Sequence, residues 1–217
     1  MHCSIFAPVA LLSVQPMLIV ARKSLPPSDL RELVDWLKAN PGKASLGIQG
    51  IGTAGHVFGV FFYKQTGTSV QLVPYRGAGP AMQDLLAQQI DFIIDTPTNS
   101  LPQVRAGNIK AYAVTAQRRL ASAPDIPTVD EAGLAGFHFS FWQALWAPRQ
   151  TPTAVIHKLN DAVVASLADK NVRERFAEQG QEIPLIAQQT PEALGDFHRA
   201  EVDKWWPVVK AANIKAE

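Results

Sequence analysis

Cysteine is nearly absent from this sequence: Cys3 is the only one in 217 residues. A lone cysteine excludes an internal disulfide and any metal cluster built from several thiolates. The five histidines show neither an HExxH motif nor a paired spacing, and no Gly-x-Ser-x-Gly motif supplies a nucleophilic serine. The sequence therefore predicts no metal site and argues against a hydrolase.

An excess of one charge is also missing, because 20 Lys and Arg residues nearly balance 19 Asp and Glu residues, for a net charge of +1. No stripe of Lys or Arg supplies the positive field on which nucleic-acid binding depends. Long apolar runs are absent too: the early run 8–14 is too short to span a bilayer, and only His2 precedes it where a signal peptide carries Lys or Arg. We expect no nucleic-acid partner and no targeting segment.

The sequence does contain alternating strand-like and helix-like segments, and 47% of its residues are hydrophobic, enough for one large domain or two small ones. A buried strand is predicted at 17–21, and Ser28 is the predicted N-cap of a helix that Asn40 ends. A further strand is expected at 111–114. This alternation predicts an α/β fold with mostly parallel sheets, in which the loops after the strands share one edge. Three strands between these, each followed by a helix, are 44–48, 70–73 and 92–94.

The second part of the chain changes character. A capping box at 128–131 predicts a short helix, and a return strand is expected at 144–148. Amphipathic helices are predicted at 153–167, then up to Gly180, and last from Thr190. Pro207 lies inside the last helical pattern, where its ring removes a hydrogen bond, so we expect that helix to kink or stop there.

The most informative segment is the glycine-rich turn 50–56, which follows a predicted strand and opens a helix. Glycine-rich backbone entering a helix presents unpaired N–H groups at the positive end of the helix macrodipole. Such groups favour a carboxylate or phosphate without a charged side chain. The turn predicts an anion site, and the alternative is a tight turn that binds nothing.

The same turn, Gly50-x-Gly52-x-x-Gly55, also fits a dinucleotide-binding fingerprint. The fingerprint expects an acidic residue about 20 positions further on to hold the ribose, and the sequence has no such residue there. Arg76 could instead meet a 2′-phosphate. An NADP-dependent oxidoreductase therefore stays open as the alternative function.

Other polar and aromatic residues each have two interpretations. His56 can donate to an anion or pack at the helix surface. Asp95 can accept from a ligand or cap the loop that follows it. Asp84 and Asp91 are expected to face solvent, and Trp142 either packs in a core or floors a cleft.

Several segments, taken together and in order, resemble one family: the extracytoplasmic solute receptors of tripartite tricarboxylate transporters, the Bug-type receptors. The resemblance covers nearly the whole chain, and the ordered series is specific where one segment would not be. The segments are 6–12, Thr53-Ala54-Gly55-His56, 73–81 (VPYRGAGPA), 91–95 (DFIID), 106–111, 124–133 and Ala147-Pro148.

This resemblance implies a two-lobed fold of the periplasmic-binding-protein type (type II). One lobe is expected at 23–142, and the other at 1–22 with 143–217. The family's mature chain begins before Phe6, with a signal peptide, a strand and a loop. The lobe at 23–142 is therefore expected to be complete, and the other partial by N-terminal truncation.

The resemblance also implies a function. It implies a periplasmic receptor that closes on a small organic acid and delivers it to a membrane permease. The receptor is expected to act as a monomer, with no reaction, catalytic residue or cofactor. Family members grip ligand carboxylates through loop backbone amides and ordered water.

Matching positions give the expected site. Gly52, Thr53 and Ala54 would meet one carboxylate, the Thr53 hydroxyl would donate to it, and Arg76 would attract a dianion. The loops at 75–77 and 95–96 would form neighbouring walls. The expected ligand-binding residues are Gln49, Gly52, Thr53, Ala54, His56, Tyr75, Arg76, Gly77, Asp95, Thr96 and Trp142.

Overall fold

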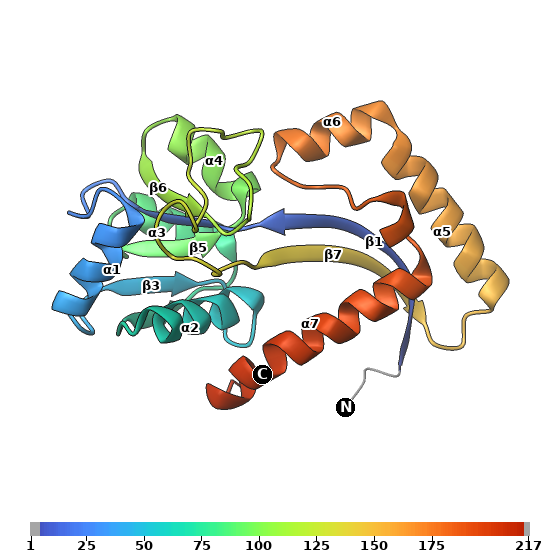
Figure 1. Cartoon of the computed structure of the whole chain (residues 1–217), viewed down its shortest axis with the longest axis horizontal. Helices are drawn as coiled ribbons and strands as arrows, with labels where there is room; N and C mark the ends of the chain where they lie inside the picture. Colours follow the sequence, from blue (N-terminus) through green and yellow to red (C-terminus); the bar gives the residue numbers. More distant parts are fainter. Residues whose placement is uncertain (1–4, 215–217) are drawn as a thin grey trace. The chain divides into compact units, whose positions relative to one another are not determined.

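The computed structural model describes residues 5–214 (Figure 1). The chain divides into two compact units, and it passes between them after Gln15, after Ser140 and after Trp206. The boundaries expected from the sequence, 22/23 and 142/143, lie further along the chain. Unit 1 consists of Met1–Gln15 and Phe141–Trp206, and unit 2 of Pro16–Ser140 and Pro207–Glu217.

Unit 2 is built on a five-stranded sheet in the order β4-β3-β5-β2-β6. β3 runs parallel to β4 and β5, whereas β2 is antiparallel to β5 and β6. All strands except β2 therefore point the same way, and the prediction of a mostly parallel α/β sheet is confirmed. The strands are β2 (Leu18–Arg22), β3 (Ser45–Ile48), β4 (Gln71–Pro74), β5 (Phe92–Asp95) and β6 (Ile109–Val114).

Helices cover both faces of this sheet, because neighbouring residues of a strand point to opposite sides. Phe92 of β5 meets Phe62 of α2, with ring centroids 5.7 Å apart. Ile93, the next residue, packs in a cluster with Leu85 of α3 and Leu101 of α4. The helices are α1 (Leu30–Ala39), α2 (Ala54–Thr66), α3 (Ala78–Leu86) and α4 (Pro97–Arg105).

The N-cap of α1 is not the predicted residue. Asp29 caps the helix, since its side chain accepts from the N–H of Glu32 at 2.9 Å. The prediction of Ser28 is therefore wrong. Ser28 donates from its N–H and from its hydroxyl to the Glu32 carboxylate, each over 2.7 Å. Serine and aspartate are both favoured at the N-cap position. Here Asp29 occupies that position, with an extended backbone (φ −136°).

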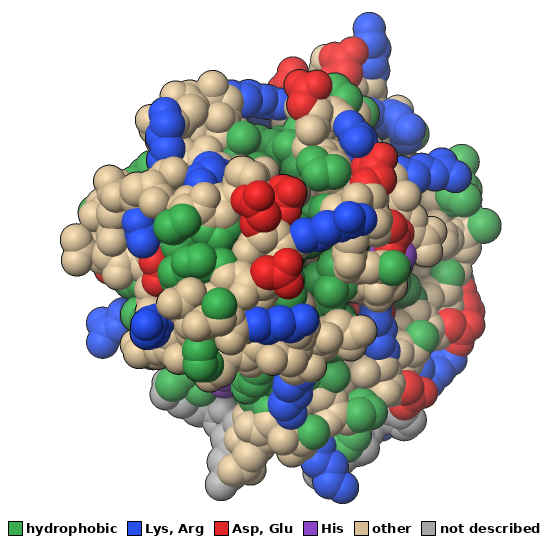
Figure 2. All heavy atoms as spheres, turned by 60° about the vertical axis from the view of Figure 1, so that its left-hand side comes forward, with side chains coloured by type: hydrophobic (Ala, Val, Ile, Leu, Met, Phe, Trp, Pro, Cys, Tyr) green, Lys and Arg blue, Asp and Glu red, His purple; other side chains and the backbone are tan. Residues whose placement is uncertain are grey.

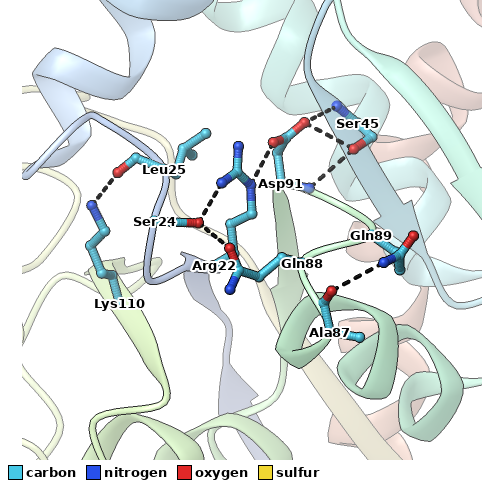
Figure 3. A network of polar contacts seen from close by, with 9 residues as sticks. All are labelled: Arg22, Ser24, Leu25, Ser45, Ala87, Gln88, Gln89, Asp91 and Lys110. Atoms are coloured by element: carbon cyan, nitrogen blue, oxygen red, sulfur yellow. Dashed lines mark hydrogen bonds and ion pairs between the residues drawn. The ribbon is translucent and has the colours of Figure 1, made fainter.

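A polar network joins the strands at the end of the sheet where β3 and β5 begin (Figure 3). The Asp91 carboxylate accepts from Arg22 Nε at 2.9 Å, and from the N–H and hydroxyl of Ser45 at 2.8 and 2.9 Å. Lys110 donates to the Leu25 carbonyl nearby. The expectation that Asp91 faces solvent is wrong, because its side chain is only 16% exposed. This network ties β2, β3 and β5 together.

Unit 1 contains a two-stranded sheet of β1 and β7. Its core cluster combines Val9 and Ala10 of β1 with Ala147 of β7 and Ile156 of α5. The sequence patterns predicted no strand for β1, and β7 begins before the predicted residue 144. The elements are β1 (Phe6–Pro16), β7 (Ser140–Pro148), α5 (Thr153–Ala168), α6 (Lys170–Glu178), the 3₁₀ helix η1 (Ile186–Gln188) and α7 (Pro191–Ala211), whose end belongs to unit 2.

One local prediction is wrong, and one of the two outcomes expected at Pro207 does not occur. Thr128 and Glu131 do form the reciprocal hydrogen bonds of a capping box, over 2.8 and 3.2 Å, but only turns follow and no helix forms. Pro207 does not stop α7, which continues to Ala211. A capping box satisfies the first N–H groups, but propagation requires an apolar face to bury.

The surface drawn in Figure 2 mixes basic and acidic side chains. Lys and Arg side chains alternate with Asp and Glu side chains across that face, with small apolar areas between them. This distribution agrees with the nearly neutral net charge of the chain. Among the described residues, no helix combines the length and the apolar character needed to cross a membrane.

Candidate functional site

Three helices of unit 2 begin at the edge of the sheet where β3, β4 and β5 end. The parallel register places the ends of these strands, Ile48, Pro74 and Asp95, on that shared edge. α2 and α3 then start with no side-chain cap on their N-terminal N–H groups and no acidic residue in their first turn, whereas the Asp95 carboxylate already accepts from Thr96 at the start of α4. Uncapped N–H groups and the positive ends of helix dipoles make this edge favourable for an anion.

The glycine turn before α2 is held by its own hydrogen bonds. Gly50 and Gly52 have φ values of +127° and +77°, a region that favours glycine. The Gly52 N–H donates to His56 Nδ1 at 3.1 Å. The N–H and hydroxyl of Thr53 both donate to the Gly50 carbonyl, at 3.4 and 2.8 Å. Direct donation from Gly52 or from the Thr53 hydroxyl to a ligand would require these bonds to open.

The free donors lie one step further into α2. The first helical bond runs from Val57 N–H to the Thr53 carbonyl. Within residues 5–214, the N–H groups of Ala54, Gly55 and His56 have no acceptor. Of the residues matched by resemblance, Ala54 and His56 thus offer free amides. Gly55 was missed, although the sequence signal was present, because every residue of an uncapped first turn carries such a group.

His56 supports the turn through its ring. Since Nδ1 accepts from the Gly52 N–H, the neutral imidazole carries its proton on Nε2. Partial burial lowers the pKa of His56, which favours this neutral form. The histidine therefore fixes the shape of the turn as well as contributing its own backbone N–H.

Gln49 joins two of the loops. Its side-chain Nε2 donates to the Ile94 carbonyl at 3.0 Å, which links the end of β3 to the end of β5. A Cβ on Gly55 would lie 1.6 Å from the Gln49 Oε1 atom, so a larger residue at this position would force the Gln49 side chain to move. Gln49 therefore connects two loops of the candidate site through its side chain.

The second loop presents a cation. The Tyr75 hydroxyl donates to Asp84 at 2.8 Å, and burial, reinforced by Asp84, raises the pKa of Tyr75 to about 12. The expectation that Asp84 faces solvent is thus wrong, since it is half-buried and bonded. Arg76 is exposed and forms no ion pair or side-chain hydrogen bond within the described residues. Gly77, with φ +109°, occupies the N-cap position of α3 and has no side chain that could cap the helix.

The third loop contains a buried carboxylate. Asp95 is 2% exposed, and it accepts from Asn99 Nδ2 at 2.6 Å, from Ser100 Oγ at 3.0 Å and from the backbone of Thr96. Burial raises the pKa of Asp95, and the three hydrogen bonds oppose that rise. These bonds favour the capping interpretation of Asp95. Thr96 is the N-cap of α4.

Trp142 belongs to unit 1, whereas the loops just described belong to unit 2. Its ring packs edge-on against Phe197 at 5.4 Å and against His198 at 6.1 Å. The structure therefore brings the other expected residues together at one edge of unit 2. Among residues 5–214, no group of three His, Cys, Asp or Glu side chains is placed to hold a metal ion.

Two units, one with a mostly parallel sheet and an anion-favouring edge, define a protein of the type II periplasmic-binding-protein class. Residues 3–214 match the family described as tripartite tricarboxylate transporter family receptor, and the chain belongs to that family. Its members and structural neighbours are solute-binding receptors and not enzymes, so the NADP-dependent oxidoreductase is set aside.

Solved structures agree with this assignment. The periplasmic binding protein BugD has a TM-score of 0.88 and 38% identity, over 98% of this chain and 71% of BugD. MatC from Rhodopseudomonas palustris, with bound malate, has a TM-score of 0.88 and 36% identity, over 94% of this chain and 69% of MatC.

Curated sequences agree as well. A protein of the TAR-I ttuE-ttuC' intergenic region of Agrobacterium vitis is 41% identical over 209 residues, which are 96% of this chain and 60% of that protein. BugT of Bordetella pertussis is 32% identical over 208 residues, which are 96% of this chain and 63% of BugT. The chain thus spans about 60% of the length of these relatives.

Proposed function

We propose that this chain is a periplasmic solute-binding receptor that captures a small organic acid and delivers it to the permease of a tripartite tricarboxylate transporter. The observation that carries this proposal is the pair of uncapped helix N-termini, those of α2 and α3, at one edge of unit 2. A carboxylate there accepts from the N–H groups of residues 54–56, with no proton transfer, metal or cofactor.

Arg76 extends the site toward a second negative charge. It stands next to the N-terminus of α3 with no acidic partner of its own, so it attracts an anion over a distance before the amides make contact. Relatives support this chemistry, because MatC was solved with malate and Rpa4515 of R. palustris with adipate, both dicarboxylates.

We further propose that the range expected from the sequence, 23–142, which unit 2 covers up to Ser140, is the complete ligand-binding lobe and that unit 1 is a part of the other lobe. Two features support this division. The sheet of unit 2 has five strands and that of unit 1 has two. Leu185 and Ile186 of unit 1 are 74% and 77% exposed, which leaves apolar surface uncovered. A ligand gripped by one lobe alone is less enclosed, so we expect affinity to rise in a longer chain.

The proposal is tested by removing one amide donor. Proline is favoured at the first position of a helix, so Ala54→Pro deletes the Ala54 N–H while keeping α2. Titration calorimetry with malate and adipate should show a loss of about 1–2 kcal/mol, which is a roughly 5- to 30-fold weaker Kd.

Lys170→Pro is the matched control, since Lys170 is the first residue of α6 in unit 1, and its affinity should equal that of the parent. Equal binding by Ala54→Pro and the parent would contradict the proposed role of the amides. Failure of every dicarboxylate to bind, to this chain and to a longer one, would contradict the receptor function itself.

A further inference from the structure

One buried side chain of unit 2 bonds to residues that lie next to two of the points where the chain leaves this unit. The hydroxyl of Thr115 accepts from the Met17 N–H at 2.8 Å and donates to the Phe139 carbonyl at 2.7 Å. The backbone of Thr115 adds two bonds: its N–H donates to the Met17 carbonyl at 2.9 Å, and its carbonyl accepts from the Phe139 N–H at 3.2 Å. Thr115 is 1% exposed, so water has little access to these groups.

These bonded positions lie next to two of the three crossings between the units. The chain leaves unit 1 between Gln15 and Pro16, and it returns between Ser140 and Phe141. Met17 is one residue inside the first crossing, and Phe139 is one residue inside the second. Pro16 has no N–H and cannot donate a backbone bond. The backbone is therefore fixed by Thr115 on the unit 2 side of each of these two crossings.

The same cluster adjoins the candidate binding edge. Leu18 pairs with Asp95 on one side and with Val114 on the other, so Thr115 follows β6 at the edge where the binding loops lie. Phe139 also stacks on Phe58 of α2, with ring centroids 4.2 Å apart and planes at 28°. The helix whose N-terminus offers free amides thus packs directly against a residue that Thr115 holds.

We propose that Thr115 is a clasp that fixes the two connecting strands to unit 2 and sets the point at which the chain bends between the units. Any movement of the chain between the units then begins beyond Met17 and Phe139, and the binding edge and α2 move as one body with these two residues. This inference adds a positioning residue for closure to the proposed receptor function, and only its ligand-dependent part rests on that function.

The direct test removes the hydroxyl and keeps the shape. Thr115→Val has nearly the same volume but leaves the Met17 N–H and the Phe139 carbonyl without their side-chain partner. Thr115→Ser keeps the hydroxyl. Thr66→Val is the matched control, because Thr66 is a buried threonine of unit 2 whose hydroxyl donates to Phe62 at 2.8 Å within α2.

Two measurements report on the clasp without a ligand. Amide hydrogen exchange at Met17 should be roughly tenfold faster in Thr115→Val than in the parent, and unchanged in Thr66→Val. Spin labels on Lys38→Cys in unit 2 and Lys158→Cys in unit 1, with Cys3→Ser, report the distance between the units. The distance distribution should become about twofold broader in Thr115→Val, while Thr115→Ser keeps the parent width.

A folded Thr115→Val protein with the parent's distance distribution would overturn the inference. If Thr115→Val does not fold, hydrogen exchange in the parent protein still tests the inference. A Met17 amide that exchanges in the parent as fast as an amide of unstructured chain would overturn the inference, because the clasp requires a protected donor. With malate and adipate as probes, Thr115→Val should bind roughly threefold to tenfold more weakly than the parent. If neither malate nor adipate binds any variant, the proposed receptor function is contradicted. The spin-label distances, which need no ligand, then still test the proposed role of Thr115.

Discussion

At the scale of single residues, the buried carboxylate of Asp95 shows how the candidate edge is stabilised. A buried ionised group is costly unless its oxygens accept hydrogen bonds, and three donors from the start of α4 meet this carboxylate. The side chain therefore organises the loop after β5, and the anion-favouring groups are backbone amides elsewhere on the edge.

Replacing Asp95 should destabilise unit 2. Asp95→Ala leaves the donors of Asn99, Ser100 and Thr96 without their acceptor, and we expect a loss of about 2–3 kcal/mol in the free energy of unfolding. Urea denaturation monitored by circular dichroism measures this loss. Asp35→Ala, at an exposed position of α1, serves as the control and should change stability by less than about 0.5 kcal/mol. A similar small effect of Asp95→Ala would refute the assigned role.

His56 should make stability depend on pH. Its folded-state pKa is lowered by burial, so the unfolded state binds more protons as the pH falls. The contribution of His56 is fully present above its unfolded pKa of about 6.5 and is lost as the pH falls through the lower folded value. Thermal unfolding from pH 7.5 to 5 should show this loss in the parent.

His56→Gln provides the comparison for that titration. The glutamine oxygen can still accept from the Gly52 N–H but does not titrate in this range. The pH dependence of the melting temperature should be smaller in His56→Gln than in the parent. Identical pH profiles would show that His56 does not contribute.

At the scale of elements, the sequence was sufficient for most of unit 2. Strand positions and the shared edge followed from apolar runs separated by glycine and proline, and β2 to β6 lie within a few residues of the predicted ranges. The glycine-rich turn also predicted unpaired N–H groups at the start of α2. The structure agrees, because no side chain caps this helix. These features depend on local sequence, which is why they could be predicted.

Features that depend on distant partners could not be predicted. Asp91 pairs with Arg22 from a strand far away in sequence, and Gly52 loses its free N–H to the ring of His56. Nothing local distinguishes Ser28 from Asp29 as a cap, because both are favoured residue types. Trp142 was expected in the site by resemblance and outside the predicted strand, but it lies in β7, and its packing partners, Phe197 and His198, come from α7.

The cap of α1 offers a test at this scale. Asp29→Ala removes the acceptor for the Glu32 N–H and should lower the free energy of unfolding by about 1 kcal/mol. Ser28→Ala keeps that bond and loses only the exposed hydroxyl contact to Glu32, so its effect should be smaller. Chemical denaturation of both variants measures the difference. A larger loss in Ser28→Ala would restore Ser28 as the cap.

At the scale of the whole molecule, the two units differ in the cores that hold them. Unit 2 combines a five-stranded sheet with helices on both faces, and its apolar cluster includes residues of β2, β5, β6, α3 and α4. A core cluster of unit 1 contains Val9, Ala10, Ala147 and Ile156, and Leu11, Leu167 and Leu194 are also buried in this unit. Because buried apolar area is the main source of stability, unit 1 should open more readily.

Hydrogen exchange measured by mass spectrometry should resolve this difference. Peptides from α5, α6 and α7 should exchange faster than peptides from β2, β3 and β5, and the two sets should not lose protection at the same denaturant concentration. Simultaneous loss of protection in both units would show a single cooperative structure instead.

The central claim is that the first-turn amides of α2 and α3 bind the carboxylates of a small organic acid. Backbone amide chemical shifts, measured by NMR during titration with malate, test this claim most directly. The account predicts the largest shifts at residues 54–56 and 78–79, and none at the first turn of α1, whose N–H groups are capped by Asp29. Saturating malate with no shift at residues 54–56, or with the main shifts elsewhere, would contradict it.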